Sequence, residues 1–227
     1  MPKALVEIQG MSLLEYAIRK LKFYGISDII INIHHFSEHI IDFVQTHDFG
    51  VNISISDESE RLMNTGGGLL KVKDFFDTAM PFIVVNVDII SSINLAQMYE
   101  KHCAHNALAT LAVSKRKTSR YLLFDEEQQL CGWENCITQE HIFSRPKNLH
   151  CLHQQAFSGM QILSPHIFDY IIEQGAFPII DMYVRLAQTQ TIQAFDHSND
   201  FWIDAGKFDT LHEITQKLKM QKLDFLA

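Results

Sequence analysis

Two aspartates, Asp88 and Asp204, are the residues whose type and place in the sequence best suit chemistry. Asp88 ends the apolar run of residues 81–87, and Asp204 ends the short segment 201–203. In open α/β sheets, ligands bind at the carboxyl ends of strands. Two such carboxylates from distant parts of the chain predict a Mg²⁺ site, because Mg²⁺ takes oxygen ligands. The structural alternative, strongest for an isolated aspartate, is that it caps the segment that follows.

A glycine run and a lysine are weaker candidates. Three consecutive glycines follow Thr65 inside an otherwise ordered stretch. They indicate either a sharp loop or a place where another molecule approaches the backbone. Lys3 can reach a phosphate as a point charge, although a surface lysine is usually only solvated. The sequence contains no P-loop or G-x-G-x-x-G motif, and residue spacing alone justifies no Ser/His/Asp or Cys/His arrangement.

Composition narrows the class of protein. The formal net charge of −8 argues weakly against a nucleic-acid partner but not against a nucleotide. No apolar run approaches the roughly 18 residues that span a bilayer, and the first residues do not form a signal peptide. The four cysteines lack C-x-x-C spacing, so we expect free thiols. We therefore predict a cytoplasmic protein without nucleic-acid or membrane partners; the sequence leaves the oligomeric state open.

The elements around these residues alternate between strand and helix in the first half of the chain. A helix is predicted between Ser12 and Gly25, a strand over 28–34, a helix from Ser37, and strands over 51–56 and 81–87. This alternation is typical of a parallel sheet. The second half adds a hairpin around 126–128 and a strand over 155–163. We predict an α/β fold in a single domain, 1–227: a doubly wound, mostly parallel, Rossmann-like sheet flanked by helices, with a small β-hairpin insertion.

Six short segments occur in an order that resembles the sugar-1-phosphate nucleotidyltransferases. They are residues 2–6, 13–16, 65–68, 86–88, 157–160 and 202–206. The resemblance covers nearly the whole chain and looks closest to short, single-domain members of the muramate- and mannose-1-phosphate type. Each segment is only moderately specific, whereas six in the same order are strong together.

The resemblance implies that a nucleoside triphosphate and a sugar 1-phosphate react to give a nucleotide-sugar and pyrophosphate. It implies that Asp88 and Asp204 hold Mg²⁺ and that Lys3 contacts phosphate. Two further groups are implied to bind substrates: the base-binding Thr65, Gly66, Gly67 and Gly68, and the ribose- or sugar-binding Asn86, Ser158 and Gly159. The nucleophile is an already ionised phosphate oxygen, so the absence of a recognisable general base is expected.

One departure from the family pattern concerns the start of the sequence. Family members carry an apolar strand and a G-x-G-x-R loop ahead of the Pro-Lys segment, and this sequence starts at Pro2-Lys3. Such a loop binds phosphates through backbone N–H groups and an arginine. Either the true start lies upstream, which we favour, or the protein is a shortened one. For the 227-residue chain we expect weak turnover and a destabilised sheet lacking its first strand.

Two alternatives to a nucleotidyltransferase stay open. One is a degenerate member that binds a nucleotide or nucleotide-sugar without turnover, which the retention of both aspartates disfavours. The other is an enzyme of another α/β class, such as a glycosyltransferase, which the order of the segments disfavours. The sequence does not reveal which base or which sugar is used.

Overall fold

The chain divides into two compact units, each assembled from separate stretches of sequence. A computed structural model describes residues 2–76, 79–145, 151–206, 211–221 and 223–226. Unit 1 comprises Met1–Leu62, Val85–Ile93 and Asp200–Ala227. Unit 2 comprises Met63–Val84 and Asn94–Asn199. That the whole chain acts as a single domain stays a prediction.

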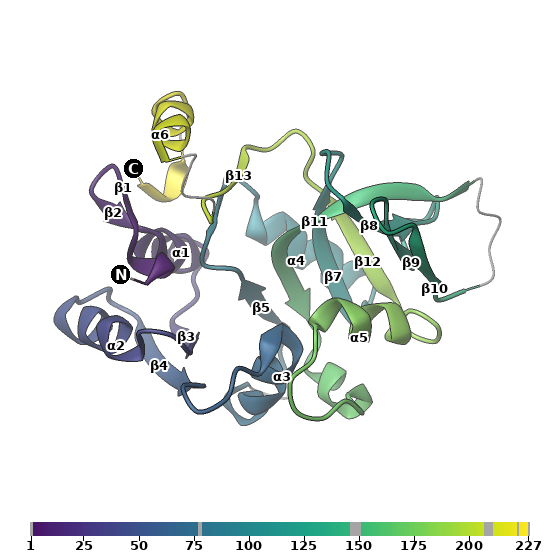
Figure 1. Ribbon diagram of the computed structural model, residues 1–227, viewed down its shortest axis with the longest axis horizontal. Helices are drawn as coiled ribbons and strands as arrows, with labels where there is room; N and C mark the ends of the chain where they lie inside the picture. The colour runs from purple at the N-terminus through teal and green to yellow at the C-terminus, as the bar shows by residue number, and fades with distance from the viewer. Residues whose placement is uncertain (1, 77–78, 146–150, 207–210, 222, 227) are drawn as a thin grey trace. The chain divides into compact units, whose positions relative to one another are not determined.

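Unit 1 brings the two ends of the chain together, and Figure 1 shows the yellow helix α6 near the purple N-terminal strands. Its elements in chain order are η1 (Lys3–Leu5), β1 (Glu7–Ile8), β2 (Met11–Ser12), α1 (Leu13–Phe23), β3 (Asp28–Ile33), α2 (Ser37–Thr46), β4 (Asn52–Asp57), β6 (Ile89–Ser91), β13 (Trp202–Asp204), α6 (Leu211–Lys219) and η6 (Asp224–Leu226). The helices and strands predicted up to residue 56 are all present.

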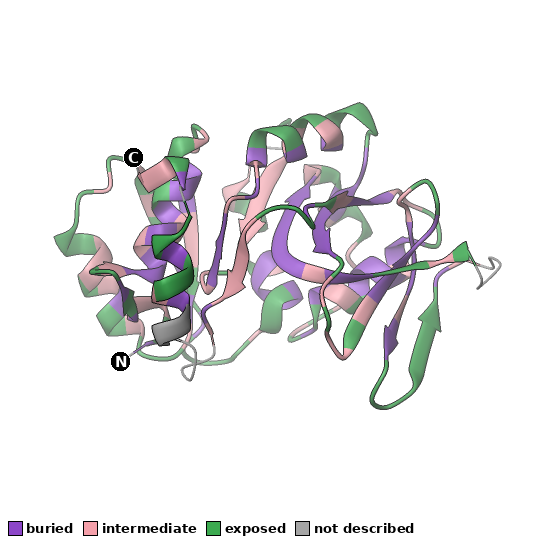
Figure 2. Cartoon of the chain, turned by 90° about the horizontal axis from the view of Figure 1, so that it is seen from above, coloured by how far each residue is buried: buried purple, intermediate pink, exposed green. Residues whose placement is uncertain are grey.

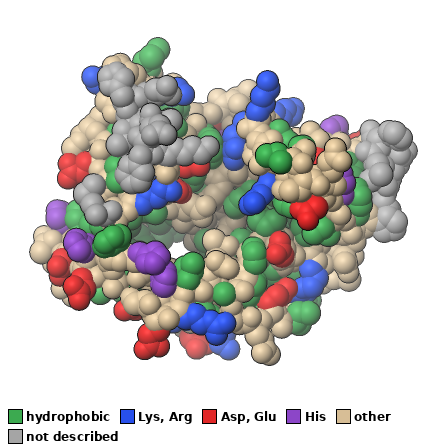
Figure 3. Space-filling model, in the orientation of Figure 1, with side chains coloured by type: hydrophobic (Ala, Val, Ile, Leu, Met, Phe, Trp, Pro, Cys, Tyr) green, Lys and Arg blue, Asp and Glu red, His purple; other side chains and the backbone are tan. Residues whose placement is uncertain are grey.

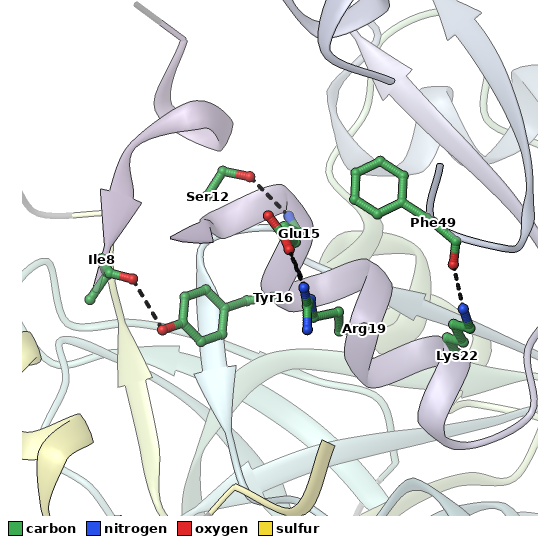
Figure 4. A network of polar contacts seen from close by, with 7 residues as sticks. All are labelled: Ile8, Ser12, Glu15, Tyr16, Arg19, Lys22 and Phe49. Atoms are coloured by element: carbon green, nitrogen blue, oxygen red, sulfur yellow. Dashed lines mark hydrogen bonds and ion pairs between the residues drawn. The ribbon is translucent and has the colours of Figure 1, made fainter. Parts of the chain in front are cut away.

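Helix α1 begins where the sequence predicts because Ser12 caps it. The Ser12 hydroxyl accepts a hydrogen bond from the Glu15 N–H at 3.1 Å, which satisfies a donor that has no partner within the helix. Glu15 also pairs with Arg19 one turn later, with 2.7 Å between Oε1 and Nη2. On the buried face, the Tyr16 hydroxyl donates to the Ile8 carbonyl at 3.1 Å (Figure 4). Polar contacts at its start and apolar burial along its side together fix this helix.

Two strand pairs in unit 1 matter for the site. β3 and β4 are parallel, as expected for strands joined through a helix, here α2. β6 and β13 are antiparallel and come from distant parts of the sequence. The core beneath them is apolar and consists of Val6, Ile8, Leu13, Tyr16, Ile90, Ala205, Ile214, Leu218 and Leu223. Because Ile90 and Ala205 belong to this core, the ends of β6 and β13 are held by packing as well as by backbone hydrogen bonds.

Unit 2 is built on a larger sheet of the order β10-β9-β8-β11-β7-β12, with β5 pairing β11. Its elements are α3 (Asn64–Lys71), η2 (Lys73–Phe75), β5 (Phe82–Val85), α4 (Leu95–Ala104), β7 (Ala109–Ser114), β8 (Arg120–Phe124), β9 (Leu130–Asn135), β10 (Glu140–Phe143), β11 (His153–Leu163), η4 (Pro165–Tyr170), α5 (Ile179–Leu186) and β12 (Ile192–Asp196). β7 and β11 are largely buried, whereas β10 is exposed along its length (Figure 2).

The α/β class predicted from the sequence is confirmed, and the strand directions follow from how each pair is connected. Parallel pairing occurs in β3–β4 and in β7–β12. β8, β9 and β10 are antiparallel because short turns join them, and β8–β9 is the predicted hairpin. β11 runs antiparallel to both β7 and β8.

No helix in the described part of the chain is long and apolar enough to cross a membrane. The face drawn in Figure 3 carries acidic and basic side chains together with exposed histidines. The absence of a nucleic-acid partner stays a prediction.

Candidate active site

The two aspartates singled out in the sequence meet at one end of the β6–β13 pair. In the antiparallel register, Asp204 lies opposite Ile89, and the ladder continues with a 2.8 Å hydrogen bond from Ala205 N–H to the Asp88 carbonyl. One expected detail is wrong. Asp88 does not end the preceding strand, because β5 stops at Val85 and a turn leads directly into β6. Pairing with β13, rather than a strand end shared with β5, therefore places the Asp88 carboxylate.

Three charged groups converge on the position of Gly206. The Lys3 ammonium donates to Asp88 Oδ2 at 3.3 Å. A Cβ built on Gly206 would lie 2.7 Å from Asp88 Oδ2 and 2.8 Å from Asp204 Oδ1, and would also collide with the Lys3 Nζ. The Gly206 N–H itself donates to Asp204 Oδ1 at 2.8 Å. A side chain at residue 206 would thus overlap all three groups, and only glycine lets them lie this close to the main chain.

This arrangement fits a hard divalent cation. Asp88 Oδ2 and Asp204 Oδ1 lie on the same side of Gly206, 2.7 and 2.8 Å from the position that a Cβ there would take, and the Lys3 and Asp88 side chains keep 46% and 25% exposure. Mg²⁺ is usually bound by one or two carboxylates together with waters and substrate phosphates, not by an all-protein cage. Among the described residues no group of three or more His, Cys, Asp or Glu forms such a cage. Asp88 and Asp204 are the residues that would hold the ion.

Lys20 braces β6, the strand that directly follows Asp88. Its ammonium is buried and donates to the Ser91 carbonyl at 2.9 Å and to the Ser91 hydroxyl at 2.7 Å. Burial lowers the pKa of Lys20 to about 7, and the Asp200 carboxylate partly opposes that shift. Burial also raises the pKa of Asp200, against the effect of Lys20. Through its two hydrogen bonds to Ser91, Lys20 joins α1 to the β6–β13 pair beside which the carboxylates lie.

Asn86 lies in the turn that precedes Asp88. Its carbonyl accepts from the Ile89 N–H at 3.2 Å, and the residue is exposed. The structure therefore leaves Asn86 accessible in the same unit as Lys3, Asp88 and Asp204. Its role in binding ribose or sugar stays a prediction.

The glycine run does not form a sharp loop, which was one of the two possibilities for it. Gly66, Gly67 and Gly68 are buried within α3. A Cβ on Gly66 would collide with the Phe177 ring and lie 2.9 Å from its carbonyl, and a Cβ on Gly67 would collide with the Gly175 carbonyl. At Gly66 and Gly67, what approaches the backbone is thus the chain itself. The glycines did indicate that something lies close to the backbone, but the sequence did not show that it is the segment at Gly175 and Phe177.

Thr65 belongs to α3, but its side chain bonds to the start of α5. Its hydroxyl accepts from the Ile179 N–H, the first residue of α5, at 3.1 Å. The Gly66 N–H donates to the Phe177 carbonyl at 2.9 Å beside it. Thr65 is otherwise exposed. A contact from Thr65–Gly68 to a base stays a prediction, whereas their part in joining α3 to α5 is direct.

Ser158 and Gly159 lie in an irregular part of β11 in unit 2. Its pairing with β7 shifts register between Phe157 and Gln161. Gly159 has a φ of +76°, which favours glycine. Ser158 is fully buried, and its hydroxyl is 2.7 Å from His197 Nε2. Nothing in the sequence indicates this Ser–His contact, because the two residues are far apart along the chain.

The predicted site residues thus fall into two groups, each within its own unit. Lys3, Asn86, Asp88 and Asp204 belong to unit 1, and Thr65 to Gly68, Ser158 and Gly159 belong to unit 2. Gly206 was part of a recognised segment but had no role assigned. Its signal in the sequence is a glycine two residues after a strand-end aspartate.

Comparison with known proteins adds a family match. The family described as nucleotidyl transferase matches residues 1–221. The chain is similar to mannose-1-phosphate guanyltransferase 2 of Candida glabrata, at 26% identity over 209 residues, covering 91% of this chain and 56% of that protein. It is also similar to the mannose-1-phosphate guanyltransferase of Saccharomyces cerevisiae, at 27% over 216 residues, with the same coverage of each. The chain spans about half the length of these curated relatives.

The fold has a counterpart among solved structures. HddC from Yersinia pseudotuberculosis superposes with a TM-score of 0.76 at 20% identity, covering 96% of this chain and 90% of HddC. Another structure of HddC, complexed with GMP-PN, gives a TM-score of 0.74. At this level of identity the likeness shows a shared fold.

Proposed function

Because the chain belongs to the nucleotidyl transferase family, we propose that it is a sugar-1-phosphate nucleotidyltransferase. The reaction joins a nucleoside triphosphate and a sugar 1-phosphate into a nucleotide-sugar and releases pyrophosphate. The observation that carries this proposal is the convergence of Asp88, Asp204 and the Lys3 ammonium around Gly206. The two carboxylates can hold a metal ion, and the ammonium can neutralise phosphate charge, as a reaction between two phosphate compounds requires.

The chemistry needs alignment and charge neutralisation more than proton transfer. An oxygen of the sugar 1-phosphate forms a bond to the α-phosphorus of the triphosphate. The bond from that phosphorus to the oxygen bridging to the β-phosphorus breaks, and its electron pair leaves with pyrophosphate. The attacking oxygen is already ionised near neutral pH, so no side chain has to remove a proton. Within this scheme Lys3, whose side chain is nearly half exposed, neutralises phosphate charge.

Mg²⁺ is the cofactor we propose for this site. When bound, it supplies charge neutralisation and a fixed template for the phosphates. Asp88 and Asp204 would hold it, as their oxygens and their shared space allow. The glycine at residue 206 lets both carboxylates and the Lys3 ammonium lie close to the main chain. Asn86, which is exposed in the turn before Asp88, is the residue we propose to contact ribose or sugar.

The substrates to test first follow from the relatives. Both relatives named above are mannose-1-phosphate guanyltransferases, so guanosine triphosphate with mannose 1-phosphate is the leading pair. The other common triphosphates and glucose 1-phosphate complete the screen. We place the reaction among soluble substrates in the cytoplasm, consistent with the sequence.

The test measures pyrophosphate release for each pair, with and without Mg²⁺. Asp88→Asn and Asp204→Asn each remove one carboxylate charge and should lower turnover by at least about a hundredfold. Asp42→Asn is the matched control, because Asp42 is an exposed aspartate on α2 of the same unit. Thermal unfolding of all three variants should match the parent.

Two results would contradict the proposal. Unchanged turnover in Asp88→Asn would show that Asp88 does not hold a metal ion needed for the reaction. A thermal shift with a triphosphate but no pyrophosphate release from any pair would favour binding without turnover instead.

A further inference from the structure

Helix α1 contacts both charged parts of the candidate site in unit 1. Near its start it packs against η1, which begins at Lys3, and its Tyr16 hydroxyl bonds to the Ile8 carbonyl just beyond. Near its end it packs against β6, the strand that directly follows Asp88. One helix therefore connects the segment that carries the ammonium to the strand beside the carboxylates.

Lys20 makes the polar contact between α1 and β6. It is only 4% exposed, and its ammonium donates to both the carbonyl and the hydroxyl of Ser91, which is 0% exposed. Ser91 is the last residue of β6 and lies opposite Trp202, the first residue of β13. Asp204 lies opposite Ile89 at the other end of the same ladder. Lys20 thus bonds one end of the strand pair, and the carboxylates lie at the other.

The β6–β13 pair is short enough to transmit a shift from one end to the other. Each strand has three residues and is therefore roughly 10 Å long. Beyond Ser91, the Ser92 N–H donates to the Phe201 carbonyl at 2.9 Å, and the Phe201 N–H donates to the Ser92 hydroxyl at 3.0 Å. Because the strands are bonded together past the residue that Lys20 holds, a displacement of Ser91 moves both strands and, with them, Asp88 and Asp204.

Two further groups face the Lys20 ammonium, and both belong to the C-terminal part of unit 1. The Phe225 ring of η6 lies with its centroid 5.9 Å from the Lys20 Nζ. The Asp200 carboxylate, which precedes β13, interacts electrostatically with the ammonium. Burying an ammonium costs free energy unless it is bonded and neutralised, and these partners lower that cost. Lys20 therefore connects α1 with β6, with the segment entering β13 and with η6.

From this geometry we propose that Lys20 is a positioning residue for the two metal-binding carboxylates. By holding Ser91 against α1, it sets where Asp88 and Asp204 lie relative to the Lys3 ammonium, whose segment packs against the same helix. The inference rests on the proposed function, in which these carboxylates hold Mg²⁺. Lys20 acts through β6 and β13, not by touching the ion or a phosphate.

The first measurement needs neither metal nor substrate. The Ala205 N–H donates to the Asp88 carbonyl and the Gly206 N–H donates to Asp204 Oδ1, each at 2.8 Å, so hydrogen exchange of these two amides reports on the site itself. In Lys20→Met, NMR should show both amides exchanging on the order of tenfold faster, through local opening of the strand pair in a chain that stays folded. The amides of β3 and β4 should exchange as in the parent.

The second measurement is the Kd for Mn²⁺, which prefers oxygen ligands as Mg²⁺ does and is followed by electron paramagnetic resonance. In Lys20→Met this Kd should rise on the order of tenfold, as is typical when a residue that orients metal ligands is lost. The direction is informative, because removing a positive charge near two carboxylates would by itself strengthen cation binding. Weaker binding therefore indicates displaced ligands.

Ser91→Ala tests the same link from the other partner. It removes one of the two oxygens that accept from Lys20, so the Kd for Mn²⁺ should rise in the same direction but by less. The double variant should resemble Lys20→Met alone, because the Ser91 hydroxyl has no ammonium left to accept from.

Lys22→Met is the matched control. Lys22 lies two residues further along α1, and its ammonium also donates to a backbone carbonyl, that of Phe49 at 2.6 Å (Figure 4). That contact leads toward β4 and not toward β6. Losing it removes the same kind of bond and the same charge, and should change neither the exchange of Ala205 and Gly206 nor the Kd for Mn²⁺.

Faster exchange of both amides together with weaker Mn²⁺ binding supports the positioning role. An unchanged Kd with a lowered thermal midpoint would show that Lys20 serves stability alone, and tighter binding would show that it acts only through its charge; either result overturns the inference. Should Lys20→Met fail to fold, Ser91→Ala decides by the same two measurements. If the parent chain binds no Mn²⁺, the proposed metal site fails, and amide exchange alone then decides whether Lys20 positions the two carboxylates.

Discussion

Glycines serve opposite purposes in the two units. At Gly206 of unit 1, the missing side chain leaves a space bordered by an ammonium and two carboxylates. At Gly66 and Gly67 of unit 2, the corresponding space is filled by the chain's own segment at Gly175 and Phe177. The first glycine lets three charged groups gather beside the main chain, and the other two allow two segments to pack. A glycine inside an ordered stretch therefore marks close approach, and its neighbours decide whether a ligand or the protein approaches.

The largest effect that we expect is a loss of turnover when the glycine of unit 1 is replaced. Gly206→Ala places a methyl group among Lys3, Asp88 and Asp204. Because these groups would have to move apart, turnover should fall on the order of a hundredfold. Pyrophosphate release measures this loss. The thermal midpoint should stay close to that of the parent, since the affected side chains are partly exposed. A large loss of stability with turnover equal to that of the parent would show that Gly206 serves packing and not the site.

The effect on stability should be largest in the other unit. Gly66→Ala forces a methyl group onto the Phe177 ring and carbonyl, and overpacking of this kind costs about 2 kcal/mol. The higher helix propensity of alanine offsets only part of that cost. The midpoint of a urea transition should fall accordingly. Adding Phe177→Ala should cost less in the Gly66→Ala background than in the parent, because the clash is partly relieved; strict additivity would show that the two residues do not meet.

A smaller, pH-dependent effect tests how the carboxylate site is braced. The folded pKa of Lys20 is about 7, against 10.5 for an ordinary lysine. Between these values the unfolded chain binds a proton that the folded chain does not, so the stability contributed by this group rises with pH. The slope can reach about 1.4 kcal/mol per pH unit.

The comparison with Lys20→Met isolates that slope. This variant keeps a long apolar side chain but has no amine to titrate. The difference in free energy of unfolding, parent minus variant, should increase from pH 7 to pH 9. A flat difference would mean that the Lys20 amine keeps an ordinary pKa in the fold. The hydrogen bonds to Ser91 predict, in addition, that the variant is less stable than the parent at pH 9.

Several parts of the fold and the site followed from the sequence because they depend on local rules. Ser12 and Glu15 predicted the start of α1, since a cap acts within one helical turn. Asp88 and Asp204 were paired by their positions after apolar segments, and the structure does bring them to one place. The order of six segments predicted the family, and the family match confirms it.

Other features were decided only by tertiary structure, because they join residues that are distant in the chain. Periodicity cannot show that Asp88 precedes β6, since the pairing with β13 is what makes residues 89–91 a strand. The glycine run became a helix because the segment around Phe177 packs against it. His197 reaches Ser158 across β7, and nothing in either local sequence indicates that contact. The sequence determined which residues could do chemistry, whereas strand pairing and packing decided which of them share a space and which serve the fold.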